Sequence, residues 1–165
     1  MKIKICYIFL VITHFSVAQN SLDELLDHYN NESIPYISVT ALKDIQDEVL
    51  ILDAREKVEF NVSHLKGAQF VGYNDFQITS VIKQNISKND TIVVYCSLGV
   101  RSEDISEKLK GEGYINVYNL YGGIFEWKNK NYTVVNSKEE ITEEVHACSK
   151  QWAKWLRKGK KVYSN

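Results

Sequence analysis

The most constraining feature of the chain is the segment TIVVYCSLGVRS at residues 91–102, where an apolar run ends at a cysteine. Residues 91–94 are all β-branched, which is typical of a buried strand. A short loop follows Cys96, and a helical pattern starts at Ser102, with acidic residues in its first turn and apolar residues recurring four apart. The segment therefore predicts a strand, a tight loop and a helix.

This order places the thiol of Cys96 near the N-terminus of a helix. The unpaired backbone N–H groups there, and the positive end of the helix dipole, favour a negatively charged sulfur. In such sites the pKa of a cysteine falls from roughly 8.5 to about 3.5–7.5, and the thiolate becomes the resting form. Arg101 adds a fixed positive charge at the far end of the loop. These features predict a sulfur nucleophile that acts on an anionic reactant.

Composition narrows the class of protein. The chain has 165 residues, of which 44% are hydrophobic and 25% charged, as expected for a soluble globular domain with a sizeable core. The formal net charge is −1, and we therefore expect no nucleic acid as a partner.

The first 18 residues have the features of a secretory signal peptide. Lys2 and Lys4 precede a mostly apolar run at residues 5–15, and small residues lead up to Ala18. We expect cleavage after Ala18 and an exported protein, either periplasmic or secreted. The alternative is a membrane anchor, but the apolar run is shorter than the ~20 residues that span a bilayer. We therefore expect no stable membrane anchor.

Cleavage would remove Cys6 and leave Cys96 and Cys148 in the mature chain. An exported compartment permits disulfides, so one bridge between these two cysteines is the alternative to a reactive Cys96. The electropositive loop around Cys96 favours the reactive thiol, because such surroundings stabilise a thiolate.

Strand-like and helix-like patterns alternate between residues 34 and 136, with a helical pattern before them. Strands are expected at 36–39, 49–52, 69–71, 91–95, 115–120 and 132–135, and helices at 21–29, 40–45, 56–62, 78–82, 102–110 and from 124. This alternation predicts an α/β domain with a mostly parallel central sheet flanked by helices. Reactive groups in such sheets lie at the carboxyl ends of strands, where Cys96, Asp53 and Arg55 are found.

The pattern changes after residue 136. Ser137 and Glu140 have the spacing of a capping box, and apolar residues from Ile141 to Leu156 fall on one face of a helix. We expect this added C-terminal helix to pack onto the domain, with binding of a partner as the alternative. Cys148 lies on the same face. We interpret it as a buried small hydrophobic residue, with a role in redox chemistry or sulfur relay as the alternative.

Four segments of the chain resemble a single-domain rhodanese, which is a thiosulfate-type sulfurtransferase. They are residues 50–56 (LILDARE), 60–68 (ending in HLKGA), 92–102 (IVVYCSLGVRS) and 117–127 (VYNLYGGIFEW). They follow one another in the order and spacing of the family. One departure is Ser63, which stands where the family usually has glycine before the histidine. The expected organisation is a signal peptide (1–18), an N-terminal extension (19–33), a rhodanese-like domain (34–136) and a C-terminal helical extension (137–165).

The resemblance implies a role for each matched residue. Cys96 and Arg101 match the catalytic positions, with Cys96 as the nucleophile that becomes a persulfide. The residues implied in substrate binding are Ser97, Leu98, Gly99, Val100, Ser102, Asp53 and Arg55, of which the last two are a pair that braces the loop. A purely structural ion pair is the alternative for Asp53 and Arg55. The matched positions implied to be structural are Glu59, His64, Gly122 and Gly123.

The expected function is therefore a sulfurtransferase. It would move a sulfane sulfur from a small donor, such as thiosulfate or a persulfide, to a thiol or a cyanide-like acceptor, with an acceptor protein as a further candidate partner. Converging N–H donors suit this chemistry because they stabilise the charge on the added sulfur. We expect neither a metal nor a cofactor.

Two alternatives remain from the same resemblance. One is a non-turnover sulfur carrier or binding module of the rhodanese fold. The other is a cysteine-dependent phosphatase or arsenate reductase. Such phosphatases place arginine six residues after the cysteine, whereas Arg101 follows Cys96 by five, and Tyr95 replaces their histidine. The smaller loop favours a single sulfur atom over a tetrahedral phosphate.

Overall fold

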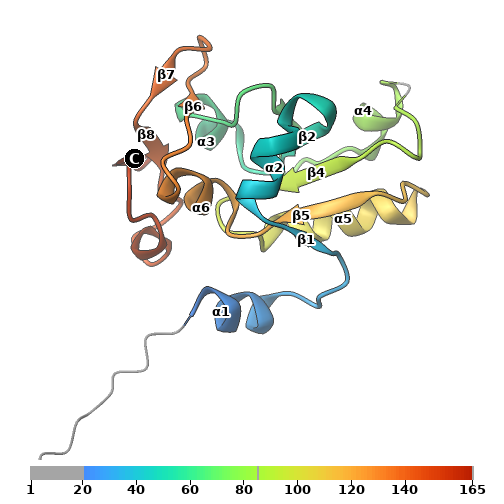
Figure 1. Cartoon of the computed structure of the whole chain (residues 1–165), viewed down its shortest axis with the longest axis horizontal. Coiled ribbons are helices and arrows are strands. Elements are labelled where there is room, and N and C mark those ends of the chain that lie inside the picture. Colours follow the sequence, from blue (N-terminus) through green and yellow to red (C-terminus); the bar gives the residue numbers. More distant parts are fainter. Residues whose placement is uncertain (1–20, 85, 165) are drawn as a thin grey trace, which may run out of the picture.

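The computed structural model describes residues 21–84 and 86–164, and a five-stranded parallel sheet forms their centre (Figure 1). The strand order is β1-β5-β4-β2-β3, and each neighbouring pair is parallel. The strands are β1 (Tyr36–Ile37), β2 (Leu50–Asp53), β3 (Gln69–Phe70), β4 (Ile92–Tyr95) and β5 (Val117–Leu120). The predicted α/β fold with a parallel central sheet is confirmed.

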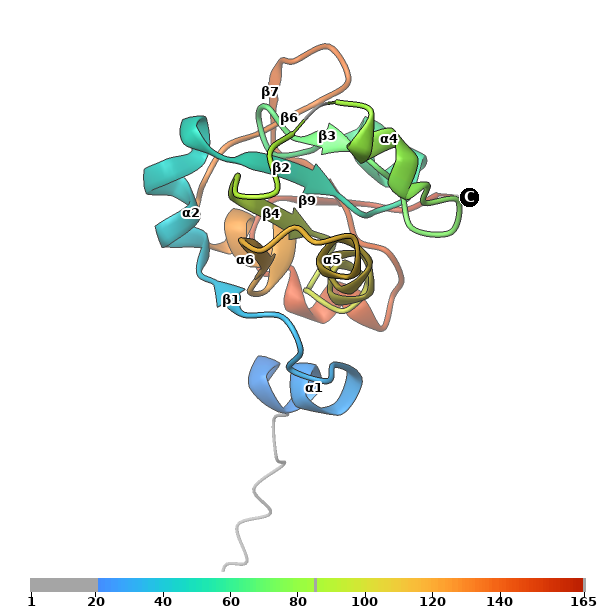
Figure 2. The same ribbon diagram turned by 90° about the vertical axis from the view of Figure 1, so that its right-hand side faces the viewer.

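Helices cover both faces of the sheet (Figure 2). Residues of α2 and α6 belong to the core on one face, and residues of α4 and α5 to the core on the other. The helices of the domain are α2 (Val39–Ile45), the short 3-10 helix η1 (Gln46–Glu48), α3 (Lys57–Val62), α4 (Ile78–Ile82), α5 (Arg101–Gly111) and α6 (Gly123–Asn129). This arrangement explains why the central strands carry apolar residues at successive positions.

Strand β4 shows how the two faces are filled. Val93 and Tyr95 belong to the core beneath α2 and α6, whereas Ile92 and Val94 belong to the core beneath α5. All four side chains are fully buried. Each buried aliphatic side chain contributes about 1.5–3 kcal/mol relative to an exposed one, so β4 is a rigid support for the loop that follows it.

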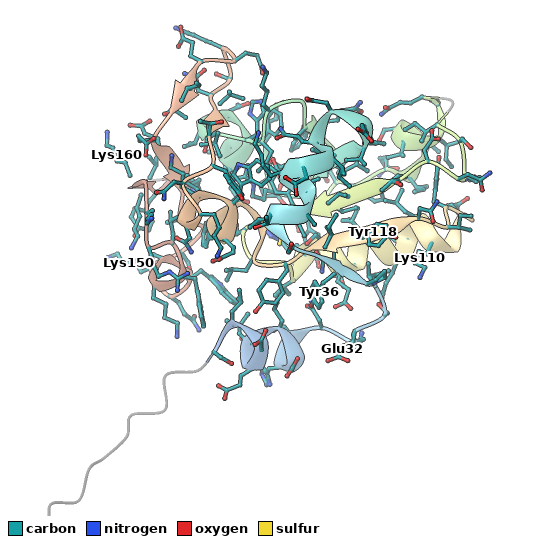
Figure 3. All side chains as sticks on the ribbon, viewed as in Figure 1. Glu32, Tyr36, Lys110, Tyr118, Lys150 and Lys160 are labelled. Atoms are coloured by element: carbon teal, nitrogen blue, oxygen red, sulfur yellow. The ribbon has the colours of Figure 1, made fainter. Side chains whose placement is uncertain are left out.

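The N-terminal extension forms helix α1 (Leu22–Tyr29), as predicted. Ser21 and Glu24 close a reciprocal capping box at its start, and Leu26 is buried. In Figure 3, Tyr36 lies between α1 and the sheet, and its hydroxyl accepts a hydrogen bond from Asn30 at 2.7 Å. The predicted signal peptide, residues 1–18, lies outside the described residues. Within 21–84 and 86–164, we find no helix with the length and apolar character needed to cross a bilayer.

The predicted C-terminal helix is wrong. The segment instead forms short strands and one turn of 3-10 helix (Figure 1). Strand β7 pairs antiparallel with β6, and β8 pairs parallel with β9. The elements are β6 (Val134–Val135), β7 (Ile141–Thr142), β8 (Glu144–His146), η2 (Trp152–Trp155) and β9 (Lys160–Val162).

Local side-chain chemistry overrides the helical pattern. The side-chain oxygen of Asn136 accepts hydrogen bonds from the N–H groups of Lys138 (2.8 Å) and Glu140 (3.1 Å), which makes a turn where a helix was expected to start. Glu139 and Cys148 have left-handed backbone, with φ of 59° and 62°, and this conformation interrupts a helix. The apolar residues after residue 136 are buried from separate short elements rather than from one helix face, and Val145 and Leu156 belong to the main core.

Candidate active site

The loop after β4 curls around the sulfur of Cys96. The backbone N–H of Gly99 donates to Cys96 Sγ at 3.1 Å, and the hydroxyl of Ser102 lies 3.5 Å from the same atom. Helix α5 begins at Arg101, one residue before the predicted start. The strand, tight loop and helix predicted from the sequence are all present. The thiol therefore lies at the N-terminal end of a helix with donors aimed at it.

The surroundings of Cys96 favour its thiolate. Burial alone would raise the pKa of the thiol. The positive charge of Arg101 and the hydrogen bonds from Ser102 and Gly99 outweigh burial, so the pKa is lowered from its ordinary value. The side chain is only 2% exposed. The site therefore favours a negatively charged sulfur in a protected position.

Two asparagines hold the loop in this shape. The carbonyl of Gly99 accepts hydrogen bonds from the side-chain amides of Asn119 at 2.7 Å and Asn30 at 2.9 Å. The side-chain oxygen of Asn119 also accepts from the hydroxyl of Ser102 at 2.7 Å. Neither residue was predicted from the sequence to belong to the site. A polar residue inside the apolar run of β5 was a signal for Asn119, whereas nothing in the N-terminal extension marked Asn30.

The turn before α6 supports the other side of the loop. The N–H groups of Ile124 and Phe125 donate to the carbonyls of Cys96 at 3.0 Å and Ser97 at 3.2 Å. Gly123 has a φ of 52°, and a Cβ atom there would lie 2.3 Å from the Cys96 carbonyl oxygen. Only glycine allows this close approach, so the predicted tight turn beside the site has a direct steric reason.

Arg101 is anchored by Glu59 of α3. Its Nη1 lies 2.7 Å from Glu59 Oε2 and its Nη2 lies 2.9 Å from Oε1, while Nη2 also donates to Ser97 Oγ at 3.1 Å. Burial raises the pKa of Glu59, but the hydrogen bonds and charge of Arg101 outweigh it and lower the pKa to about 2. The guanidinium is thus fixed and charged, and 20% of the Arg101 side chain remains exposed.

A small cavity opens above the thiol. Its volume is about 190 Å³, and its lining residues are Cys96, Ser97, Leu98, Val100, Arg101, Cys148 and Trp152. Five of these belong to the loop and the start of α5, as the sequence predicted. The other two, Cys148 and Trp152, come from the C-terminal segment. The cavity has room for a small molecule, with the sulfur at one wall and the arginine at another.

These features match a known family. A family model, Rhodanese-like domain, matches residues 38–130. The chain belongs to the rhodanese-like family. The matched range lies inside the rhodanese-like domain expected at residues 34–136 and contains the loop from Cys96 to Arg101.

Proteins with related sequences share only part of their length with this rhodanese-like chain. It is 37% identical over 111 residues to a tRNA uridine(34) hydroxylase from Aster yellows witches'-broom phytoplasma (strain AYWB), covering 65% of this chain and 36% of that protein. It is 31% identical over 104 residues to the candidate sulfur carrier protein YrkF of Bacillus subtilis (strain 168), covering 61% of this chain and 55% of that protein.

Solved structures share the rhodanese fold. A thiosulfate sulfurtransferase from Pseudomonas aeruginosa gives a TM-score of 0.58 at 20% identity, covering 74% of this chain and 23% of that chain. The rhodanese-like domain of Alr3790 from Anabaena gives 0.55 at 23% identity, covering 62% of this chain and 79% of that chain.

Asp53 and Arg55 of the rhodanese-like domain lie behind the loop. Both side chains are fully buried, and neither lines the cavity at Cys96. Arg55 Nη2 lies 2.6 Å from Asp53 Oδ2 and donates at 2.6 Å to the carbonyl of Ser63, and the Tyr95 hydroxyl donates to Asp53. The expectation that this pair contacts substrate is therefore corrected, because neither side chain reaches the cavity that Cys96 lines. The pair joins the ends of β2 and β4.

His64 has the contacts of a structural histidine. Its ring nitrogens lie 3.1 Å from the carbonyl oxygen of Phe60 and 3.1 Å from a carboxylate oxygen of Glu139, and the ring stacks on Phe60. Ser63, the departure from the family pattern, has a φ of −167°. This is extended backbone that any residue adopts, so the serine fits the turn without strain.

Cys148 does not have the position expected from the sequence. It is an exposed free thiol that lines the cavity, whereas a buried side chain on a helix face was expected. Cys96 is also free, so the structure does not contain the disulfide considered as an alternative. Among the described residues, no group of three or more His, Cys, Asp or Glu side chains is arranged to hold a metal ion.

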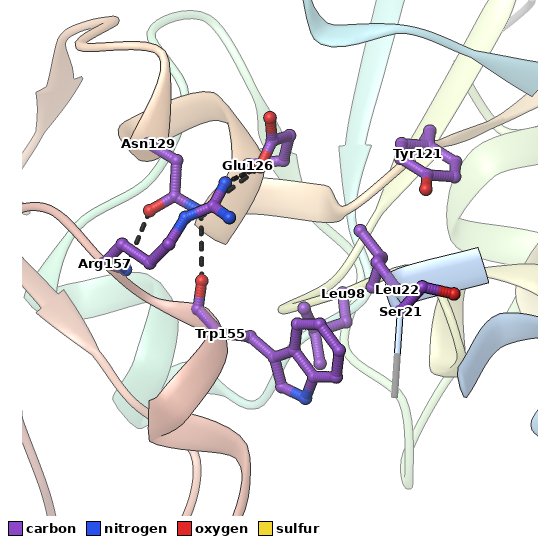
Figure 4. Close-up of a pocket in the computed structure, with 8 residues that line it drawn as sticks. All are labelled: Ser21, Leu22, Leu98, Tyr121, Glu126, Asn129, Trp155 and Arg157. Atoms are coloured by element: carbon purple, nitrogen blue, oxygen red, sulfur yellow. Dashed lines mark hydrogen bonds and ion pairs between the residues drawn. The ribbon is translucent and has the colours of Figure 1, made fainter. Parts of the chain in front are cut away.

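A second cavity of about 420 Å³ adjoins the loop at Leu98 (Figure 4). Its lining includes Glu126, Asn129 and Arg157, which are joined by hydrogen bonds and one ion pair. Among the described residues that line it there is no cysteine. The reactive sulfur therefore faces the smaller cavity, and the larger one lies next to it along α6 and η2.

Proposed function

We propose that the protein is a sulfurtransferase that moves a sulfane sulfur from a small donor to a thiophilic acceptor through a persulfide on Cys96. The observation that carries this proposal is the convergence of the backbone N–H groups of Gly99 and Ser102 on the sulfur of Cys96, with the Ser102 hydroxyl 3.5 Å away, beside the fixed charge of Arg101. This arrangement stabilises one negatively charged sulfur atom.

The first half-reaction loads the cysteine. The Cys96 thiolate attacks the outer sulfur of thiosulfate, the sulfur–sulfur bond of the donor breaks, and sulfite leaves with the bonding electron pair. Arg101 lines the cavity and attracts the anionic donor. The added sulfur carries negative charge and remains within reach of the donors around the loop.

The second half-reaction removes the added sulfur from Cys96. A thiolate or cyanide attacks the outer sulfur of the persulfide, the bond to Cys96 Sγ breaks, and the Cys96 thiolate is regenerated. The lowered pKa of Cys96 assists this step, because a more acidic thiol is a better leaving group. No cofactor is needed, since each half-reaction balances without an external oxidant or reductant.

The hydrogen bonds between Arg101 and Glu59 favour a sulfur atom over a phosphate group as the transferred group. Both terminal nitrogens of Arg101 bind Glu59, at 2.7 and 2.9 Å. An arginine that holds a tetrahedral phosphate presents these same nitrogens to the phosphate oxygens. In this chain the guanidinium supplies charge and support, which are sufficient for a single sulfur atom.

We extend the proposal to location and partners. From residues 1–18 we propose an exported protein whose donor is a small anionic sulfur compound and whose acceptor is a thiol or a cyanide-like molecule. The net charge of −1 and the small size of the cavity support small-molecule donors over a nucleic acid.

The proposal is tested by turnover of the purified full chain with thiosulfate and cyanide, measured as thiocyanate. The wild type and a Cys6→Ser control are expected to produce thiocyanate, and Cys96→Ser is expected to produce none. Intact mass after thiosulfate alone should rise by about 32 Da, the mass of one sulfur atom. Undiminished turnover by Cys96→Ser would reject the proposal.

A further inference from the structure

Two free thiols line the same cavity, and only one of them is used by the half-reactions above. Cys96 forms the base of the cavity and is 2% exposed, whereas Cys148 is exposed and lies on the segment that covers it. Trp152 and Leu98 complete the apolar part of the wall. A cavity of about 190 Å³ that holds two thiols brings both within reach of one small substrate.

The fold holds Cys148 at this place. Strand β8 packs on α3 and ends at His146, whose Nδ1 accepts a hydrogen bond from the Cys148 N–H at 3.1 Å. The next N–H, of Ser149, donates to the carbonyl of Ala147 at 2.7 Å. These bonds and the left-handed backbone of Cys148 turn the chain sharply over the loop. The thiol is thus placed by a folded segment anchored to the domain.

We propose that Cys148 is the first acceptor of the sulfane sulfur, taking it from Cys96 within the cavity and carrying it to the protein surface. This inference rests on the proposed sulfurtransferase function and names the residue that receives the sulfur. It explains how a buried persulfide can serve an acceptor too large to enter the cavity.

The step balances without an added reagent. The Cys148 thiol loses its proton to solvent, and its thiolate attacks the outer sulfur of the Cys96 persulfide. A bond forms between Cys148 Sγ and that sulfur, the bond to Cys96 Sγ breaks, and Cys96 leaves as a thiolate. Sulfur changes its carrier, and no net oxidation or reduction takes place.

The electrostatics give the transfer a direction. Partial desolvation of the Cys148 thiol at the cavity wall raises its pKa, with a further contribution from the charge of Glu59, whereas the pKa of Cys96 is lowered. The more basic thiolate is the stronger nucleophile, and the more acidic thiol is the better leaving group. Once Cys148 is ionised, both differences favour movement of the sulfur from Cys96 to Cys148.

The experiment determines which cysteine-containing peptide carries the extra sulfur. The full chain is incubated with thiosulfate, quenched with an alkylating reagent and digested, and each cysteine peptide is examined for a gain of about 32 Da. In the wild type the Cys148 peptide is expected to carry the sulfur. In Cys148→Ser the sulfur should remain on Cys96, and in Cys96→Ser neither peptide should gain it. The Cys6 peptide, which is present in the full chain before cleavage, is the internal control.

The outcomes separate the relay from the proposed function. Sulfur on Cys96 but never on Cys148 in the wild type overturns the relay alone. A Cys96–Cys148 disulfide with release of sulfide also overturns it, because the sulfur is then lost rather than carried. Failure of Cys96 to gain sulfur in both the wild type and Cys148→Ser rejects the proposed function itself.

A second measurement compares acceptors of different size. Turnover from thiosulfate is followed with cyanide and with a thiol-bearing polyethylene glycol. Cys148→Ser is expected to lower the polymer rate at least about tenfold more than the cyanide rate, because the buried persulfide is then the only carrier. The matched control is Cys148→Ser with Lys150→Cys, which restores a thiol at an exposed position two residues away. Equal loss with both acceptors, or full rescue by the control, would overturn the relay.

Discussion

Glu59 and Arg101 meet in two parallel hydrogen bonds, with Nη1 to Oε2 at 2.7 Å and Nη2 to Oε1 at 2.9 Å. The carboxylate comes from α3, and the guanidinium comes from the first residue of α5. Ser97 Oγ also donates to Glu59 Oε1 at 3.2 Å. Glu59 therefore holds both Ser97, the second residue of the loop, and Arg101, the residue that ends it.

This pair makes stability depend on pH. The pKa of Glu59 is lowered from 4.5 to about 2 in the folded chain, and such a shift corresponds to roughly 3 kcal/mol. A depressed pKa contributes stability that is complete above pH 4.5 and is lost as the pH falls toward 2. Glu59→Gln is expected to lower the free energy of unfolding at pH 7 by about 2–3 kcal/mol and to flatten its decline over that window. Urea unfolding between pH 7 and pH 2 measures both effects.

The control for this prediction is Glu126→Gln. Glu126 also binds an arginine, Arg157, but that arginine side chain is 68% exposed. Exposed pairs contribute about 0–1 kcal/mol, so this variant should keep the pH dependence of the wild type. An equal decline of stability with pH in Glu59→Gln and the wild type would show that the pair with Arg101 does not set the pH dependence.

Asn119 is expected to be as important to the loop as the residues of the loop itself. Its fully buried side chain binds both the Gly99 carbonyl and the Ser102 hydroxyl, at 2.7 Å each. Asn119→Ala leaves buried polar groups without partners, which costs about 1–3 kcal/mol each, and it loosens the donors around the sulfur. We expect lower stability and lower thiosulfate turnover. Asn116 is half-buried, and its side chain makes one hydrogen bond, to the Asn89 carbonyl at 2.7 Å. Asn116→Ala should therefore cost no more than about 0.5–1.5 kcal/mol, and equal effects of the two variants would contradict the prediction.

The sequence was sufficient to predict the parts of the fold that repeat a simple pattern. The strand at residues 91–95, the loop and the helix after it follow from a β-branched run, a cysteine and a capped apolar repeat. Each of these signals is local, and packing on both buried faces of the sheet stabilises the structure that it predicts. The positions of Cys96 and Arg101 at the two ends of this loop could therefore be predicted from the sequence alone.

Contacts between distant segments could not be predicted in the same way. Asn30 lies 69 residues from Gly99, and Cys148 reaches the cavity only because β8 packs on α3. The predicted helix after residue 136 failed because the spacing of apolar residues is compatible with more than one backbone. The side chain of Asn136 forms a turn, and Val145 and Leu156 are buried from separate short elements.

Gly123 and Gly111 offer a matched test of backbone constraint. An added Cβ at Gly123 would lie 2.3 Å from the Cys96 carbonyl oxygen, at a φ of 52°, whereas at the end of α5 nothing lies within 4 Å of an added Cβ at Gly111. Gly123→Ala is expected to cost at least about 2 kcal/mol and to abolish turnover, because the loop must shift. Gly111→Ala should be neutral or stabilising by up to about 1 kcal/mol. Thermal unfolding and the thiocyanate assay compare them, and a fully active Gly123→Ala would disprove the steric argument.

The charge of Arg101 is expected to set the ionisation of Cys96. Burial raises the pKa of this thiol, and Arg101 makes the largest opposing contribution. Arg101→Gln should therefore raise the pKa of Cys96. The test uses the double variant Arg101→Gln with Glu59→Gln, because Arg101→Gln alone would leave the buried Glu59 carboxylate without a partner.

Alkylation of Cys96 by neutral iodoacetamide, followed by peptide mass across pH 5 to 10, measures the ionisation directly. The double variant is expected to react more slowly than the wild type at about pH 7, and the difference in rate should narrow as the pH rises toward about 10 and more of the Cys96 thiol is ionised in each protein. Arg157→Gln, whose guanidinium lines the other cavity, is the control and should follow the wild type. An unchanged pH profile in the double variant would show that the loop donors alone hold the thiolate.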